Sequence, residues 1–447
     1  MDTEKLFGTD GIRGIANQYP VTREMGQKLG RSLVRFCKSR GISTDVLIGR
    51  DTRASGKILE YGLVSGILST DGNPNLVGVF PTPGVAYLAR DLGFGSAIVI
   101  SASHNPPEYN GFKLFSHDGF KFSEDEESAV EKMIFEETGP LPSFSLGQME
   151  ILKDGQDRYL SFLIKTIPQQ LRDMKIIIDC ANGATFSMVP VLFQRLGLDA
   201  EAMFVEPDGK NINQNCGSQH TEALSERVIE KKADVGFAFD GDGDRLIAVD
   251  EKGKVLTGDQ ILIICAKMLQ ERGKLKNNVV VSTVMSNMGL RSALKDLGIK
   301  HIATNVGDRN VMEEMRRYNS SLGGENSGHI IFSDHHTTGD GILTALQLLY
   351  SIEIFKKTLS ELSSLMTIYP QTMINIPVHT KPEFSQVPEL AKVIKDTESE
   401  LGNEGRVLVR YSGTEPLCRV MVEGKRQEEI EKFARRIADM IARKLQQ

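Results

Sequence analysis

The sequence predicts an α/β protein made of three related α/β domains with mixed sheets, followed by a smaller C-terminal α+β domain. Two observations support this fold class. Three stretches of the chain repeat one order of signals: a short apolar run, a polar loop, a helical stretch and a second short apolar run. From about residue 366 onward this order stops, and strand-like runs alternate with two helical stretches.

Each repeated stretch predicts a βαβ unit, in which two parallel strands flank a helix that covers the sheet. The units begin with apolar runs at 46–49, 175–179 and 279–283. Each helical stretch should end at a glycine in the left-handed conformation that closes many helices. These glycines are Gly72, Gly197 and Gly298, and the second apolar runs are 76–80, 202–205 and 301–304.

The last stretch predicts the fourth domain. Strand-like runs lie at 373–376, 407–409 and 420–422, with a helix near 389–401. The chain then shows apolar residues at helical spacing, which predicts a helix whose apolar face joins the domain core. These residues are Ile430, Phe433, Ile437, Met440, Ile441 and Leu445. The expected domains span residues 1–150, 151–255, 256–366 and 367–447.

The composition is that of an ordinary globular protein that acts on small molecules. Of 447 residues, 40% are hydrophobic and 25% are charged. A net charge of -6 argues against a nucleic-acid partner, because no basic stripe can displace phosphate counterions. The five cysteines lie far apart without a CxxC pair, so reduced cytoplasmic thiols are expected. No secretion signal or membrane-spanning stretch is evident, so no membrane partner is expected.

The most informative motif is acidic. Asp240, Asp242 and Asp244 alternate with two glycines and run into Arg245. Oxygen ligands suit Mg²⁺ and glycine lets the backbone fold tightly around an ion, so the three aspartates are candidate metal ligands. A solvated acidic turn is one alternative. An EF-hand is another, but Arg245 occupies its invariant glycine position, and short strand-like runs stand where its helices should be.

A second motif offers a nucleophile. Ser103 lies in a polar loop after the apolar run 97–100, where α/β domains place their ligands. Beside His104 it is a candidate nucleophile, although a turn made by Asn105 and Pro106 explains the same residues.

Three further loops are suited to phosphate or sugar. The loop at 410–416, together with Arg419, combines hydroxyl donors, a permissive glycine and two guanidiniums, a set that suits a phosphate group. A plain β-turn would leave the two arginines unexplained. Two glycine-flanked basic loops make Arg13 and Arg53 candidates to reach toward phosphate, and loop 323–329 offers Glu325 and Ser327 to sugar hydroxyls. The first of these loops contributes Arg410, Ser412, Gly413, Thr414 and Arg419.

Taken together and in this order, five motifs resemble those of the phosphohexomutase superfamily over essentially the whole chain. The matching segments are 7–14, 101–106, 240–245, 324–329 and 410–416. The resemblance implies four domains around a central active-site cleft and a phosphoryl transfer within a small phosphosugar. It is also compatible with a homodimer.

The resemblance implies roles for individual residues. Ser103 is expected to be a phosphoserine whose phosphate lies against Mg²⁺. Lys113 and His329 are candidates for proton transfer to and from the sugar hydroxyl, and His104 and Arg245 add positive charge or hydrogen bonds. The phosphate loop should accept either phosphate of a bisphosphosugar such as glucosamine 1,6-bisphosphate. The expected metal ligands are Ser103, Asp240, Asp242 and Asp244; the expected catalytic residues are Ser103, His104, Lys113, Arg245, His329 and Arg13; the expected substrate-binding residues are Glu325, Ser327, Arg410, Ser412, Gly413, Thr414 and Arg419.

Within the superfamily, segments 7–14, 213–220 and 412–423 are similar to the phosphoglucosamine mutase branch. Its members interconvert glucosamine 6-phosphate and glucosamine 1-phosphate on the way to UDP-N-acetylglucosamine. Segment 106–113 is more similar to the phosphomannomutase/phosphoglucomutase branch, and Asn326 and Tyr411 also depart from the first pattern. The alternatives are therefore a phosphomannomutase/phosphoglucomutase, a metal-dependent sugar phosphatase and a non-catalytic sugar-phosphate sensor.

Overall fold

The computed structural model describes residues 5–8, 10–136, 147–168, 170–412 and 416–446. The chain divides into two compact units. The larger unit comprises residues 1–286 and 297–365, and the smaller unit comprises residues 287–296 and 366–447. Within the described residues, none of the helices combines the length and the apolar character needed to span a membrane.

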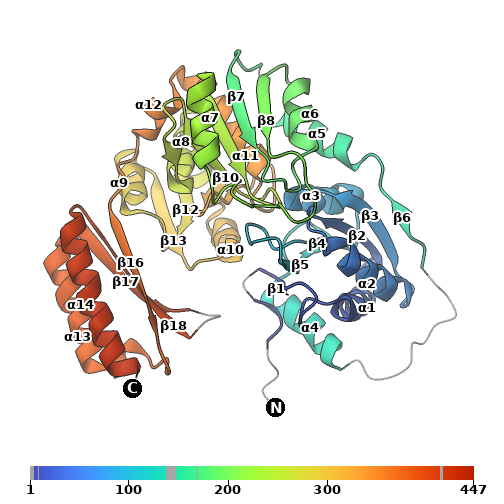
Figure 1. Cartoon of the computed structure of the whole chain (residues 1–447), viewed down its shortest axis with the longest axis horizontal. Coiled ribbons are helices and arrows are strands. Elements are labelled where there is room, and N and C mark those ends of the chain that lie inside the picture. Colours follow the sequence, from blue (N-terminus) through green and yellow to red (C-terminus); the bar gives the residue numbers. More distant parts are fainter. Residues whose placement is uncertain (1–4, 9, 137–146, 169, 413–415, 447) are drawn as a thin grey trace. The chain divides into compact units, whose positions relative to one another are not determined.

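The first sheet of the larger unit is mixed and carries helices on both faces. Its elements are β1 (Ile12–Ile15), α1 (Arg23–Ser39), β2 (Asp45–Arg50), α2 (Gly56–Leu68), β3 (Asn73–Val79), α3 (Thr82–Leu92), β4 (Ser96–Ile100), β5 (Tyr109–Ser116), α4 (Glu124–Phe135) and β6 (Glu150–Ile151). The strand order is β1-β5-β4-β2-β3-β6, and β5 runs antiparallel to both β1 and β4. Helices α1, α2 and α4 share one hydrophobic core with the sheet, and α3 packs against β2 and β4 (Figure 1).

The second sheet has the order β11-β10-β9-β7-β8. Its elements are α5 (Gly155–Lys165), β7 (Lys175–Asp179), α6 (Met188–Arg195), β8 (Asp199–Met203), α7 (Glu222–Lys231), β9 (Val235–Phe239), β10 (Leu246–Asp250) and β11 (Val255–Leu256). Strand β7 is parallel to both β8 and β9, and β10 is antiparallel to β9. Strands β9 and β10 are buried along their whole length, because the sheet is covered on both faces.

The third sheet has the order β13-β12-β14-β15, and two buried helices contact both this sheet and the second. The elements are α8 (Gly258–Glu271), β12 (Val279–Thr283), β13 (Lys300–Thr304), α10 (Asp308–Tyr318), β14 (Leu322–Gly324), β15 (Ile330–Phe332), α11 (Gly341–Phe355) and α12 (Leu359–Ser363). Helix α11 is buried over almost its whole length and contacts α5, α8, β9, β10 and β15. Its largely apolar sequence fits a helix surrounded by protein on every side.

The three expected βαβ units are present as parallel strand pairs, β2 with β3, β7 with β8, and β12 with β13. Gly197 and Gly298 have φ angles of 69° and 68°, as expected for helix-closing residues. The expectation for Gly72 is wrong, because the left-handed residue after α2 is Asp71, with φ of 63°. Gly72 instead permits close packing, since a Cβ there would lie 2.5 Å from Cγ2 of Val34.

The smaller unit is an antiparallel sheet of order β16-β18-β17 with helices packed on it. Its elements are α9 (Met288–Asp296), β16 (Gln371–Pro377), α13 (Pro388–Leu401), β17 (Gly405–Tyr411), β18 (Leu417–Gly424) and α14 (Gln427–Leu445). Helices α13 and α14 lie side by side against the sheet (Figure 1). The apolar stripe of α14 joins this core as predicted, with Ile430, Ile437 and Ile441 fully buried.

Candidate active site

The loops that follow β4 and β9 meet in the larger unit. Each loop leaves the carboxyl end of a parallel strand, the usual place for ligands in α/β sheets. Ser103 lies in the first loop and Asp240 in the second, and Oγ of Ser103 donates a 2.6 Å hydrogen bond to Oδ2 of Asp240. Ser103 is 1% exposed and has φ of 54°, a conformation uncommon for a serine. The candidate nucleophile therefore contacts one of the candidate metal ligands directly.

Asp240, Asp242 and Asp244 lie between the antiparallel strands β9 and β10, which excludes an EF-hand because that motif needs flanking helices. All three side chains are buried, and one carboxylate oxygen of each lies within 4.8 Å of the others. In the described part of the chain, Oδ1 of Asp242 and Oδ1 of Asp244 have no hydrogen-bond partner. Buried oxygens with unused acceptor capacity fit a hard cation such as Mg²⁺.

The ammonium group of Lys113, on β5, lies among the same carboxylates. Its Nζ is 2.7 Å from Oδ2 of Asp242 and 2.9 Å from Oδ2 of Asp244. Asp10, in the loop before β1, is also near, with its Oδ2 3.4 Å from Nζ. Burial alone would lower the pKa of Lys113, but these three carboxylates raise it well above the usual value. Lys113 thus supplies positive charge where the acidic loop is most crowded.

The other expected residues around Ser103 are nearby. Nδ1 of His104 lies 3.3 Å from Oγ of Ser103. Burial, together with the charges of Arg245 and Arg13, lowers the pKa of His104 to about 4. Near neutral pH this imidazole is uncharged, so of its two expected contributions it can offer a hydrogen bond and not a positive charge. Arg245 donates its backbone N–H to Asp240 over 3.1 Å, and Arg13 forms an ion pair with Asp10.

His329, which precedes β15, is buried between two acidic side chains. Its Nδ1 is 3.7 Å from Oδ1 of Asp244, and its Nε2 is 3.6 Å from Oδ2 of Asp308. Nε2 also accepts the backbone N–H of Gly339 over 3.0 Å. In its neutral form the imidazole therefore carries its proton on Nδ1, the nitrogen that faces Asp244. Burial alone would lower the pKa of His329, but Asp244 and Asp308 raise it above its ordinary value.

The loop between β14 and β15 holds the expected sugar-binding residues close to the metal loop. Its Gly328 carbonyl accepts the N–H of Leu246, the first residue of β10, over 3.1 Å. Oε1 of Glu325 accepts the N–H of Gly307 over 3.1 Å. Among the described residues, Oγ of Ser327 and Oδ1 of Asn326 are buried without a hydrogen-bond partner. Such groups are suited to ligand hydroxyls, because a buried polar atom is costly when it stays unpaired.

Family models for four phosphoglucomutase/phosphomannomutase domains match this chain. The three α/β/α domains match residues 4–140, 157–253 and 257–369, and the C-terminal domain matches residues 373–440. A protein named phosphoglucosamine mutase from Syntrophus aciditrophicus is 53% identical, and one from Geobacillus thermodenitrificans is 50% identical, each match covering 99% of both chains. The chain belongs to the phosphoglucosamine mutase family of the phosphohexomutases.

Solved structures share the fold of this phosphohexomutase. A phosphoglucomutase/phosphomannomutase family protein from Burkholderia thailandensis has a TM-score of 0.81 at 23% identity, covering 99% of this chain and 98% of that one. An N-acetylphosphoglucosamine mutase from Aspergillus fumigatus, solved with GlcNAc-6P and magnesium, has a TM-score of 0.67 at 16% identity, covering 98% and 95%. The predicted fold class, three α/β domains and a smaller C-terminal domain, is confirmed.

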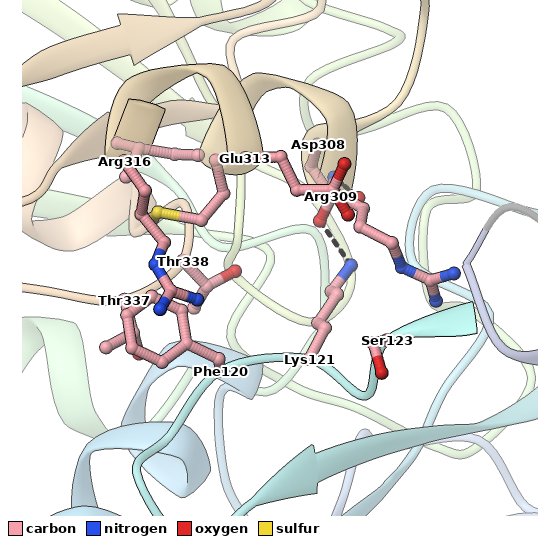
Figure 2. Close-up of a pocket in the computed structure, with 11 residues that line it drawn as sticks. Phe120, Lys121, Ser123, Asp308, Arg309, Glu313, Arg316, Thr337 and Thr338 are labelled. Atoms are coloured by element: carbon pink, nitrogen blue, oxygen red, sulfur yellow. Dashed lines mark hydrogen bonds and ion pairs between the residues drawn. The ribbon is translucent and has the colours of Figure 1, made fainter. Parts of the chain in front are cut away.

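An ion-pair network that sequence reasoning missed adjoins the phosphohexomutase site. Nζ of Lys121 pairs with both Asp10 and Asp308, the first residue of α10. Figure 2 shows Lys121 and Asp308 facing each other in a pocket lined by the segment after β5 and by α10. The network connects Lys113 to His329 through Asp10, Lys121 and Asp308. Asp10 lies in the motif at 7–14, but no local pattern marks Lys121 or Asp308.

The smaller unit contains the described part of the expected phosphate loop. Arg410 on β17 stands directly opposite Arg419 on β18. Like charges opposite each other destabilise a sheet, so this register favours an anion at the pair. Burial and Arg419 lower the pKa of Arg410. Ser412 is buried, and Tyr411 stacks on Phe384 with ring centroids 4.7 Å apart, while Gly413 and Thr414 lie outside the described residues.

Arg53 does not reach toward phosphate, contrary to the expectation from its basic loop. It is 1% exposed, and its Nε donates to Oδ2 of Asp51 over 2.9 Å. Its Nη2 donates to the carbonyl oxygens of Ser103 and Asn105 over 3.0 and 2.8 Å. Arg53 nevertheless lies beside the serine loop. The direction of its guanidinium depends on Asp51 and on that loop, which lies about fifty positions away.

Proposed function

We propose that this phosphohexomutase interconverts glucosamine 6-phosphate and glucosamine 1-phosphate through a phosphoserine at Ser103. The observation that carries this proposal is the buried Ser103 hydroxyl bonded to Asp240 in a cluster of three carboxylates. The two relatives of 50% and 53% identity, named phosphoglucosamine mutase, support the choice of amino sugar. The substrate is a small phosphosugar, and the product feeds the synthesis of UDP-N-acetylglucosamine.

The reaction is two phosphoryl transfers in opposite directions. The free sugar hydroxyl attacks the phosphorus of phosphoserine and passes its proton to a proton-transfer residue. The bond from Oγ of Ser103 to phosphorus breaks, and Oγ takes up a proton to become a hydroxyl. The resulting glucosamine 1,6-bisphosphate reorients, and Ser103 attacks its other phosphate, which leaves the isomeric monophosphate and restores the phosphoserine. Each transfer requires in-line positioning and neutralisation of charge on the phosphoryl oxygens.

The residues of the larger unit divide these tasks. Asp240, Asp242 and Asp244, with the Ser103 phosphate, would hold Mg²⁺, which when bound supplies positive charge to the transferring phosphoryl group. Arg245 adds fixed positive charge beside the same carboxylates. Lys113 and His329 are the proposed proton-transfer residues, and Glu325 and Ser327 the proposed partners of sugar hydroxyls. The phosphate loop of Arg410, Ser412, Gly413, Thr414 and Arg419 would bind the phosphate that is not reacting.

Two further features complete the proposal. The five cysteines are all buried and unpaired, which supports a reducing cytoplasmic location. A homodimer remains our proposal for the assembly, on the strength of the family resemblance alone.

Initial rates on three substrates test the proposed function. The phosphorylated, Mg²⁺-loaded protein is assayed with glucosamine 6-phosphate, mannose 6-phosphate and glucose 6-phosphate, with a bisphosphosugar present and free phosphate monitored. We expect kcat/KM to favour the amino sugar by a factor of about ten or more, roughly 1.4 kcal/mol at the transition state. Equal or faster turnover of mannose or glucose phosphates would indicate the other branch, which segment 106–113 resembles. Phosphate release in step with substrate loss would indicate a phosphatase.

A further inference from the structure

The backbone of the serine loop is held by two side chains, Arg53 and Asn213, that lie outside the five superfamily motifs. Nη2 of Arg53 donates to the carbonyl oxygens of Ser103 and Asn105 over 3.0 and 2.8 Å, and its Nη1 donates to that of Pro106. Nδ2 of Asn213 donates to the carbonyls of Ser103 and Asn105 as well, over 2.8 and 3.0 Å. Two independent donors therefore converge on the carbonyl of the candidate nucleophile.

Arg53 is itself held in place by Asp51. Oδ2 of Asp51 accepts from Nε of Arg53 over 2.9 Å, and both side chains are fully buried. The same Oδ2 accepts from Oγ of Ser101 over 2.6 Å, and that Oγ accepts the backbone N–H of Ser103 over 2.9 Å. The backbone carbonyl of Ser103 thus bonds to Arg53 directly, and its backbone N–H is linked to Asp51 through Ser101. Both groups are therefore tied to one buried ion pair. Hydrogen bonds in such a dry network are strong and resist rearrangement.

Asn213 connects the serine loop to the second sheet. Its backbone N–H donates to the carbonyl of Ala181 over 2.9 Å, in the turn that follows β7. Asp179, the last residue of β7, accepts the backbone N–H groups of Ala181 and Gly217 over 2.8 and 2.7 Å. The chain around Asn213 is therefore anchored to the sheet that carries the metal loop, so this side chain ties the serine loop to that sheet.

The conformation of Ser103 calls for such restraint. A left-handed φ is unfavourable for a residue with a Cβ and persists only where the surroundings impose it. We propose that Arg53, fixed by Asp51, and Asn213 are positioning residues that hold Ser103 left-handed, so that its oxygen keeps one place in the phosphorylated and unphosphorylated enzyme. This inference rests on the proposed function, because it requires Ser103 to carry the phosphoryl group. A displaced phosphoserine lies out of line with the sugar hydroxyl and is exposed to water instead.

The test compares Asn213→Ala with Asn215→Ala in the full-length phosphorylated enzyme. Asn215 is exposed and lies two positions away, which makes it a matched control. For Asn213→Ala we expect kcat per phosphoserine to fall by about tenfold to a hundredfold, because small displacements of reacting groups are costly. We expect KM to stay within about threefold and the loss of phosphate from phosphoserine to water to speed up relative to turnover. Arg53→Lys should shift both quantities in the same direction, because an ammonium cannot reproduce the guanidinium's set of bonds.

Three results would overturn the proposal. The first is a wild-type kcat and phosphoserine lifetime in folded Asn213→Ala. The second is an equal loss in Asn215→Ala. The third is a loss of kcat fully explained by a smaller folded fraction, measured by thermal unfolding. If the wild-type enzyme carries no phosphate on Ser103, the proposed function fails instead, so the two failures are distinguishable by mass spectrometry of the wild-type protein.

Discussion

Oγ of Ser103 lies 2.6 Å from Oδ2 of Asp240, although the two residues are 137 positions apart. Ser103 follows the buried strand β4, and Asp240 follows the buried strand β9. These two strands belong to different sheets. The packing of two sheets in one compact unit therefore creates the contact on which the proposed phosphoryl transfer depends.

Replacing the nucleophile should abolish isomerisation and preserve the fold. For Ser103→Ala we expect the mutase rate to fall by at least about a thousandfold, because no oxygen remains to carry the phosphoryl group. The loss of one buried hydrogen bond costs about 1 kcal/mol, so thermal unfolding should change little. The readouts are isomerisation rate and melting temperature, with Ser364→Ala, an exposed serine, as control. Wild-type turnover in Ser103→Ala would remove this serine from the mechanism.

Mg²⁺ should stabilise the folded chain as well as activate it. A ligand at a hundred times its Kd adds about 2.7 kcal/mol to the free energy of unfolding. We therefore expect the melting temperature to rise with added Mg²⁺ and chelation to stop turnover reversibly. Asp242→Asn should remove both responses, whereas Asp396→Asn, an exposed aspartate on α13, should retain them. An undiminished Mg²⁺ response in Asp242→Asn would place the ion elsewhere.

Arg410→Ala should weaken substrate binding. Loss of a charge-assisted bond to phosphate is expected to raise KM by about tenfold, with a smaller effect on kcat. The smaller unit should not lose stability, because the change removes a like-charge pair with Arg419. Steady-state kinetics against the exposed control Arg443→Ala measures the effect. An unchanged KM would assign the phosphate handle to other residues.

Glu127 on α4 should make stability depend on pH. Burial raises the pKa of Glu127 to about 7, and the charge of Asp10 acts in the same direction. Arg309, which pairs with Glu127 over 2.7 Å, and Lys121 act in the opposite direction. The folded chain keeps the proton up to about pH 7, whereas the unfolded chain releases it near the ordinary value of 4.5. The contribution of Glu127 to the free energy of unfolding is therefore lost as the pH rises from 4.5 to about 7.

Glu127→Gln cannot ionise, so it should gain stability relative to the wild type as the pH rises from about 5 to 8. Melting temperatures of both proteins across this range provide the measurement, with the exposed Glu124→Gln as control. A difference that does not vary with pH would show that Glu127 titrates at its ordinary value.

Close contact between α1 and α2 should make Gly66 intolerant of a side chain. A Cβ at Gly66 would lie 2.1 Å from the carbonyl oxygen of Gln27 on α1. Gly66→Ala should therefore destabilise the larger unit by about 1–3 kcal/mol, more than the helix propensity of alanine restores. Thermal unfolding against Lys57→Ala, exposed on the same helix, measures the cost. An equal or higher melting temperature would show that the two helices can separate freely.

Local patterns were enough for several predictions that the structure bears out. The apolar runs and polar loops predicted the parallel pairs β2 with β3, β7 with β8 and β12 with β13, because strand and helix signals depend on neighbours in the chain. The spacing of Asp240, Asp242 and Asp244 marked one buried cluster for the same reason, since all three lie in a single loop.

By itself, then, the sequence determined the element types, the four-domain fold class and which loops carry reactive side chains. Only the tertiary structure decided which of these side chains meet. Lys113 pairs with Asp242 across 129 positions, Lys121 bridges Asp10 and Asp308, and Arg53 turns from phosphate to the backbone of Ser103. The physical reason is that such contacts depend on how separate sheets pack around buried charge, and no local periodicity records that packing.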